Sequence, residues 1–235
     1  MQETVASLAS ARLGNERSIW IRPPRDPVTA RCLTIILDAE LYREKVAACE
    51  AIDGLAEGVA DSWFVFVSTQ SVEARWLECP CHPPFAAFIV DELLPWLAAR
   101  HPEIAAVERR VIVGLSYTGL AAAYIAIERP GVFQRVISQS GSFWWNDCHL
   151  VKRMRTTPRL PTAFYLDMGT RETQTHVQHR PEVLQVVAQI EGVRRFRDEL
   201  LAKGHEVKYV EFPGAHDCRE WRLMLPGALA WALGA

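Results

Sequence analysis

The sequence predicts an α/β fold in which a mostly parallel central sheet carries helices on both faces. Short apolar runs rich in Val, Ile and Phe alternate with longer segments of helical periodicity. Such runs are typical of strands buried on both faces of a parallel sheet, and the alternation is typical of a doubly wound arrangement. No repeat or low-complexity linker interrupts the 235 residues, so the simplest organisation is one domain over residues 1–235.

The apolar runs mark the expected strands. Trp63–Val67 is apolar at every position, which indicates burial on both sides. The complete set, in chain order, is Ser18–Ile21, Leu33–Leu37, Trp63–Val67, Arg110–Val113, Val136–Ser138, Ala163–Met168 and Val207–Phe212.

Helices are expected between these strands. Phe85–Ala99 repeats large apolar residues near a helical period, and Tyr117–Glu128 is rich in alanine. Pro181–Lys203 begins with a proline, which the first turn of a helix tolerates, and is followed by Gly204. Arg219–Leu233 closes the chain as the last expected helix.

Composition and charge exclude several classes of protein. Hydrophobic residues make up 49% and charged residues 23%, and 26 basic against 28 acidic residues give a net charge of −2. This balance favours neither a nucleic-acid partner nor an anionic membrane surface. No apolar stretch approaches the roughly 18 residues of a membrane-spanning helix, and the N-terminus lacks the features of a signal peptide. A soluble cytoplasmic protein is expected, and a homodimer remains an open alternative for its assembly.

The six cysteines are expected to be reduced in that compartment. Cys79 and Cys81 are the only close pair, and one intervening residue is not the usual spacing of a zinc site. The sequence therefore predicts no metal and no organic cofactor.

A candidate nucleophile follows the strand at Arg110–Val113. Ser116 lies in Gly-Leu-Ser-Tyr-Thr-Gly, between that strand and the alanine-rich helix. A sharp strand-to-helix turn of this kind raises a serine hydroxyl above the carboxyl edge of an α/β-hydrolase sheet. The usual pattern is Gly-x-Ser-x-Gly, whereas here Thr118 replaces the second glycine and Gly119 follows it. The simpler interpretation is a serine that caps a core helix.

A catalytic serine needs a general base, and the base needs an acid that orients it. His216 is the expected base because it lies in a short loop between the last strand and the last helix. The acid should follow the preceding strand, where Glu172 lies in the loop and Asp167 lies within the strand. Glu172 is favoured, with Asp167 and a dyad without an acid left as alternatives.

Several segments around these residues are distinctive, and they resemble the enterochelin (ferric enterobactin) esterase group of the esterase D-like α/β-hydrolases. The resemblance extends from about Arg17 to the C-terminus. The segments that carry it are Val136–Trp145, which ends in Ser-Gln-Ser-Gly-Ser-Phe-Trp-Trp, together with Leu37–Tyr42, Arg75–Phe85, Gly169–Glu172 and Gly214–Arg222. The resemblance implies an α/β-hydrolase fold and supports Glu172 as the acid.

The resemblance also indicates the oxyanion hole and the pocket. The backbone N–H of Tyr117 is expected to hold the oxyanion together with a second N–H from Ala39, Glu40 or Leu41. Substrate contacts are expected from four side chains whose other interpretations are structural. Trp144 and Trp145 either stack on an aromatic acyl group or pack in the core, Arg75 either holds an anionic group or pairs with Glu78, and His82 either lines the pocket or lies in a loop.

The predicted function is that of a serine esterase, which cleaves the carboxylic ester of a small molecule through an acyl-enzyme. The resemblance implies a catecholate siderophore ester or a related aryl ester, so that iron enters only with the substrate. An acyltransferase that uses the same machinery is one alternative. A catalytically silent binding protein is another, because Thr118 departs from the usual elbow. The polar segment Gln174–Arg180 beside the acid loop is expected to form part of a lid.

Overall fold

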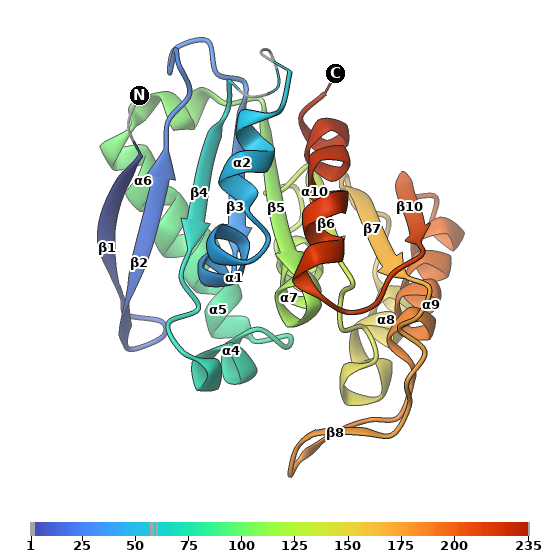
Figure 1. The fold of residues 1–235 in the computed structure, drawn as a ribbon. Coiled ribbons are helices and arrows are strands. Elements are labelled where there is room, and N and C mark those ends of the chain that lie inside the picture. The colour runs from blue at the N-terminus through green and yellow to red at the C-terminus, as the bar shows by residue number, and fades with distance from the viewer. Residues whose placement is uncertain (1–2, 57–58, 60, 235) are drawn as a thin grey trace.

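A twisted eight-stranded sheet forms the centre of the computed structural model, which describes residues 3–56, 59 and 61–234. Figure 1 shows the sheet with helices packed on both sides. The strands, in their order across the sheet, are β1 (Thr4–Ser10), β2 (Asn15–Arg22), β4 (Trp63–Val67), β3 (Cys32–Leu37), β5 (Arg109–Leu115), β6 (Arg135–Gln139), β7 (Ala163–Gly169) and β10 (Val207–Phe212). The predicted α/β class and all seven predicted strands are confirmed.

The directions of the strands determine which edge of the sheet is suited to bind a ligand. The neighbours from β4 to β10 pair in parallel, whereas β1 pairs with β2 and β2 with β4 in antiparallel fashion. The carboxyl ends of the parallel strands therefore meet at one edge of the sheet, where ligands bind in open α/β folds. Strand β1 was not predicted, because its small and polar residues leave mainly Leu8 and Ser10 buried at the edge of the sheet.

Two helical layers bury the two faces of the sheet. One layer consists of α1 (Ala39–Glu44), α2 (Ala48–Asp53) and α10 (Cys218–Leu233), which lie in front of the sheet in Figure 1. The opposite layer consists of α5 (Pro83–Ala87), η1 (Phe88–Leu93), α6 (Leu94–Arg100), α7 (Ser116–Glu128), α8 (Trp145–Thr156) and α9 (Gln189–Ala202). The short helices α4 (Val72–Glu78) and η2 (Pro102–Ala106) complete the set of described helices.

The predicted helices differ from the structure at two places. Phe85–Ala99 spans three consecutive helical elements, because a π-helical turn joins α5 to α6. Pro181–Lys203 was wrong over its first part, since the helix begins only at Gln189. The preceding residues form a small hairpin of β8 (Val177–Arg180) and β9 (Val183–Gln185), where valine-rich sequence favours extended backbone. This hairpin projects from the molecule at the carboxyl edge of the sheet (Figure 1).

Candidate active site

Ser116 occupies a sharp turn between β5 and α7. Its φ of 52° lies in the left-handed region, so the chain reverses direction within one residue. A Cβ on Gly114 would lie 2.1 Å from the carbonyl oxygen of Thr118, and a Cβ on Gly119 would lie 2.8 Å from Ser138 Oγ. Glycine is therefore required on both sides of the turn, and the displaced second glycine still serves the close packing of an elbow.

Thr118 stabilises this turn instead of crowding it. Its Oγ1 accepts a hydrogen bond of 3.0 Å from the backbone N–H of Leu115 and donates one of 2.8 Å to the carbonyl oxygen of Leu115. The side chain is fully buried and faces the end of the strand. The departure from the usual motif therefore leaves the space around the Ser116 hydroxyl free of the threonine side chain.

A histidine and a carboxylate align on the Ser116 hydroxyl. His216 lies in the loop between β10 and α10, and its Nε2 is 3.0 Å from Ser116 Oγ. Its Nδ1 is 2.5 Å from Oε2 of Glu172, which follows β7. If Nδ1 donates its proton to the carboxylate, Nε2 is left as the acceptor for the serine proton. The structure thus brings together the three side chains that the sequence singled out.

Glu172 is held from two other directions. Its Oε1 accepts hydrogen bonds from the backbone N–H of Gly169 at 3.0 Å and from Ser140 Oγ at 2.7 Å. A Cβ on Gly169 would lie 2.9 Å from this oxygen, so a side chain there would displace the carboxylate. These two donors hold the Glu172 carboxylate in one orientation, with Oε2 directed at His216.

Asp167, the other acid considered from the sequence, lies in the interior of the sheet. Its Oδ2 accepts a hydrogen bond of 3.1 Å from Gln139 Nε2, while Oδ1 has no hydrogen-bond partner among the described residues. Burial raises the pKa of this carboxyl to about 7, against the hydrogen bonds that lower it. Within the described part of the chain, no hydrogen bond joins Asp167 to His216.

Two helices begin near the nucleophile. Tyr117 lies in the first turn of α7, and Ala39 and Glu40 begin α1 after Asp38, which has a left-handed φ of 64°. The first N–H groups of a helix have no partner within the helix and point outward from its positive end. Asp38 and Glu40 line the same cavity as Ser116, so the start of α1 and the start of α7 are both suited to hold a developing oxyanion.

Two cavities meet at Ser116. The first has a volume of about 430 Å³ and the second of about 500 Å³, and Arg75, Trp76 and His216 border both of them together with Ser116. A substrate bound across Ser116 therefore has separate space for the groups on the two sides of its ester bond.

The first cavity has aromatic walls. Trp76 meets Tyr117 edge to face at a centroid distance of 4.6 Å, and Tyr117 meets Trp144 in the same manner at 5.8 Å. His179 of the hairpin lies parallel to Trp144 at 5.0 Å. Aromatic walls of this kind accept planar apolar groups.

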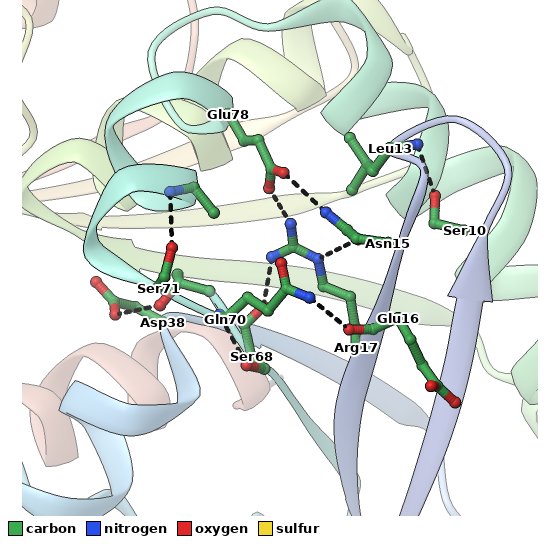
Figure 2. A network of polar contacts seen from close by, with 12 residues as sticks. Ser10, Leu13, Asn15, Glu16, Arg17, Asp38, Ser68, Gln70, Ser71 and Glu78 are labelled. Atoms are coloured by element: carbon green, nitrogen blue, oxygen red, sulfur yellow. Dashed lines mark hydrogen bonds and ion pairs between the residues drawn. The ribbon is translucent and has the colours of Figure 1, made fainter.

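Arg75 lies between the two cavities and pairs with Asp38 instead of Glu78. The distance from Arg75 Nε to Asp38 Oδ2 is 2.6 Å. Burial raises the pKa of Asp38 despite this pair. Glu78 instead pairs with Arg17, which also hydrogen-bonds Asn15; Figure 2 shows this buried network at the base of α4.

His82 and Trp145, two of the predicted substrate contacts, lie outside the linings of both cavities. His82 precedes α5, where its Nδ1 is buried without a hydrogen-bond partner among the described residues. Trp145 begins α8 and meets His149 edge to face at 6.1 Å. Neither residue therefore borders the two cavities that meet at Ser116.

The residues that border the site include several that were not predicted as site residues, among them Trp76, His179 and Gln189. Trp76 is adjacent to Arg75, which was a predicted substrate contact, and His179 lies in the predicted lid segment Gln174–Arg180. Only these neighbours in the sequence indicated that the two residues could lie near the site. In the part of the chain that the structure describes, no group of three or more His, Cys, Asp or Glu side chains is arranged to hold a metal ion. No helix over the described ranges is long and apolar enough to cross a membrane.

The sequence and the structure are similar to known esterases. A model of the family described as "Putative esterase" matches residues 10–232. An iron(III) enterobactin esterase of Dickeya dadantii is 30% identical over 98% of this chain and 54% of its own length. The corresponding esterase of Escherichia coli K12 is 31% identical over 58% of this chain and 35% of its own length.

A solved structure has the same fold. The enterobactin esterase from Shigella flexneri, determined in the presence of enterobactin, has a TM-score of 0.78 and 25% identity over 97% of this chain and 58% of its own. The chain thus spans about half the length, or less, of the curated relatives it matches.

Proposed function

Because the chain belongs to the esterase family whose model matches residues 10–232, we propose that it hydrolyses a carboxylic ester through an acyl-enzyme formed on Ser116. The resemblance to enterochelin esterases expected from the sequence is confirmed by the named relatives. The observation that carries the proposal is the alignment of Ser116, His216 and Glu172, with contacts of 3.0 and 2.5 Å.

The proposed reaction begins when His216 Nε2 takes the proton of the Ser116 hydroxyl as its oxygen attacks the ester carbonyl carbon. The tetrahedral oxyanion is held by the N–H of Tyr117 and by an N–H at the start of α1, from Ala39 or Glu40. His216 then returns the proton to the leaving alcohol, and the acyl group remains on Ser116. Glu172 stabilises the imidazolium that forms on the way.

The second half of the proposed reaction repeats these steps with water. His216 removes a proton from a water molecule, which attacks the acyl carbon and releases the carboxylic acid from Ser116. The residues present supply all proton transfers of this sequence. Iron belongs to the substrate when a ferric siderophore is hydrolysed.

The proposed substrate is a catecholate siderophore ester or a related aryl ester. Three relatives or structural neighbours are named as enterobactin esterases. The aromatic walls formed by Trp76, Tyr117 and Trp144 suit a planar ring, and the guanidinium of Arg75, which is paired with Asp38, lies at the junction of the cavities. We further propose a single catalytic domain and a cytoplasmic location, which six unpaired cysteines support.

Replacing the nucleophile tests this function. Ser116→Ala should lower turnover of a p-nitrophenyl ester and of enterobactin by on the order of 10³-fold or more. A fluorophosphonate should label the wild-type protein at Ser116 in a one-to-one ratio. Unchanged turnover in the variant would refute the assignment.

Trapping the acyl-enzyme identifies the acyl half of the substrate. The protein is incubated with a panel of esters that includes enterobactin, and the adduct on Ser116 is weighed by mass spectrometry. From the enterobactin trilactone, the first adduct expected carries the linear trimer of dihydroxybenzoylserine, because the leaving alcohol of the opened ring stays in the same molecule. Shorter dihydroxybenzoylserine adducts are expected once the released linear product is attacked in turn. Product analysis with added alcohols then separates hydrolysis from acyl transfer, because a transferase would give the ester of the added acceptor.

A further inference from the structure

Ser140 occupies the first position after β6, directly beneath the triad. Its hydroxyl is 3.0 Å from Trp221 Nε1 and 2.7 Å from Glu172 Oε1, and the side chain is fully buried. An indole N–H only donates, so the Ser140 oxygen accepts from Trp221 and its own proton points to Glu172. The orientation of this hydroxyl is therefore fixed by its two neighbours.

This hydroxyl completes the set of donors on one carboxylate oxygen. Oε1 of Glu172 receives Ser140 and the N–H of Gly169, and Oε2 is left for His216. Rotation of the carboxylate about its last bond would break both donor contacts at once. The two donors thus hold Oε2 in the direction of the imidazole.

The backbone of Ser140 is held as firmly as its side chain. Its N–H donates to the carbonyl oxygen of Asp167 at 3.0 Å, and its own carbonyl oxygen accepts from Gln189 Nε2. Gln189 in turn accepts the indole N–H of Trp144, which forms a wall of the first cavity. The φ of Ser140 is 45°, a left-handed conformation that these contacts impose on a residue with a side chain.

Trp221 connects the same residue to the base. Its ring meets His216 at a centroid distance of 4.8 Å with an interplanar angle of 87°, while its N–H reaches Ser140. Ser140 therefore contacts the acid, Glu172, directly. It is linked to the base, His216, through a single intervening side chain, that of Trp221.

We propose, on the basis of the proposed esterase function, that Ser140 is a positioning residue of the triad, whose hydroxyl aims Glu172 at His216. Trp221 acts through Ser140 by fixing the direction of that hydroxyl. Neither residue takes part in bond making or breaking.

Two substitutions at Ser140 separate the hydroxyl from the stability of the fold. Ser140→Ala and Ser140→Gly both remove the donor, but glycine also relieves the left-handed strain. Both variants should lower kcat for a p-nitrophenyl ester by about 10- to 100-fold, the range expected for a lost hydrogen bond to a charged group. KM should change by less than about 2-fold, since binding in the cavities is retained.

Each kcat is divided by the amount of Ser116 that a fluorophosphonate labels, so that misfolded protein is not counted. Ser62→Ala is the matched control, because the buried Ser62 hydroxyl also donates a hydrogen bond, of 3.1 Å to the carbonyl oxygen of Val59, but lies just before β4, at the amino-terminal edge of the sheet. This control should keep the wild-type kcat per labelled site.

A double variant tests the role of Trp221. Trp221→Phe keeps a ring beside His216 and removes the indole N–H, so it should lower kcat in the wild-type background. The same change should have little further effect in Ser140→Ala, since its path to Glu172 is already broken.

Wild-type kcat per labelled site in both Ser140 variants would overturn the proposal while leaving the esterase assignment intact. A wild-type protein that neither reacts with the phosphonate nor hydrolyses the ester would instead refute the proposed function, and the role of Ser140 with it.

Discussion

Ser116 has a strained backbone conformation, which contacts among the neighbouring residues stabilise. A left-handed φ of 52° costs a residue with a side chain about 1–2 kcal/mol, so other contacts must hold the turn. Thr118 supplies two of them by bonding both the N–H and the carbonyl of Leu115. The residue that departs from the sequence motif is thus the one that ties the helix start to the end of the strand.

Thr118→Val tests this role, because valine keeps the shape of threonine and removes the hydroxyl. The variant should lose about 1–3 kcal/mol of unfolding free energy, since buried polar groups of Leu115 lose a partner. Urea denaturation measures the change. Thr34→Val is the matched control, because the buried Thr34 hydroxyl has no hydrogen-bond partner among the described residues. Equal stability changes in both variants would contradict the assigned role.

At the scale of elements, α4 is the part of the site that most depends on distant contacts. It has seven residues, too few to be stable alone, yet it carries Arg75 and Trp76 to both cavities. Ser71 caps its start by accepting the N–H of Ala74 at 3.1 Å. Its end is fixed by the buried pair of Glu78 with Arg17 of β2, and Figure 2 shows this pair beside Ser68.

Glu78→Gln should therefore weaken the fold and the site together. Removing one partner leaves the Arg17 charge buried without its counter-ion, which typically costs about 3–5 kcal/mol. Thermal or urea unfolding measures the loss, and a higher KM is expected because α4 moves relative to Ser116. Glu108→Gln, which breaks an exposed pair with Arg31, is the control and should leave stability and KM unchanged. A Glu78→Gln variant as stable as the control would contradict this account.

The same elements explain what the sequence could predict. Ser116, Glu172 and His216 were predictable because each follows a strand whose apolar pattern is local. Trp76 and His179 were not, because they reach the site through α4 and the hairpin. The position of α4 depends on a contact between residues 61 apart in the chain.

Strand β9 was predicted as the start of a helix, since Pro181 and the later residues 189–202 fit a helical pattern, whereas β8 lies in the segment Gln174–Arg180 that was expected to form part of a lid. The extended form of this hairpin depends instead on pairing between the two strands and on His179, which contacts Gln185 at 2.8 Å and stacks near Trp144. Contacts of this kind produce no periodic pattern of apolar residues, so the sequence does not predict them.

The whole molecule assembles the site from the carboxyl ends of separate strands. Ser116 and His216 are 100 residues apart, and Ser140 and Glu172 come from two further strands between them. Unfolding of the sheet therefore removes the site at once. The same packing buries Asp167 just below the acid loop, so the stability of the whole fold depends on its protonation.

Asp167 should contribute less to the stability of the fold as the pH rises. Its pKa is raised from an ordinary 3.8 to about 7 in the folded protein, chiefly by burial. Between these values the unfolded chain has released the proton that the folded protein still binds, so the contribution favours folding most at the acid end. This contribution declines by on the order of 4 kcal/mol up to about pH 7 and is constant above it.

Asp167→Asn, which stays neutral and still accepts from Gln139, should abolish the decline. Urea denaturation of variant and wild type at intervals from pH 4 to 8 measures it. The variant should gain stability relative to the wild type as the pH rises to 7, and parallel profiles would show that Asp167 does not retain its proton in the folded protein.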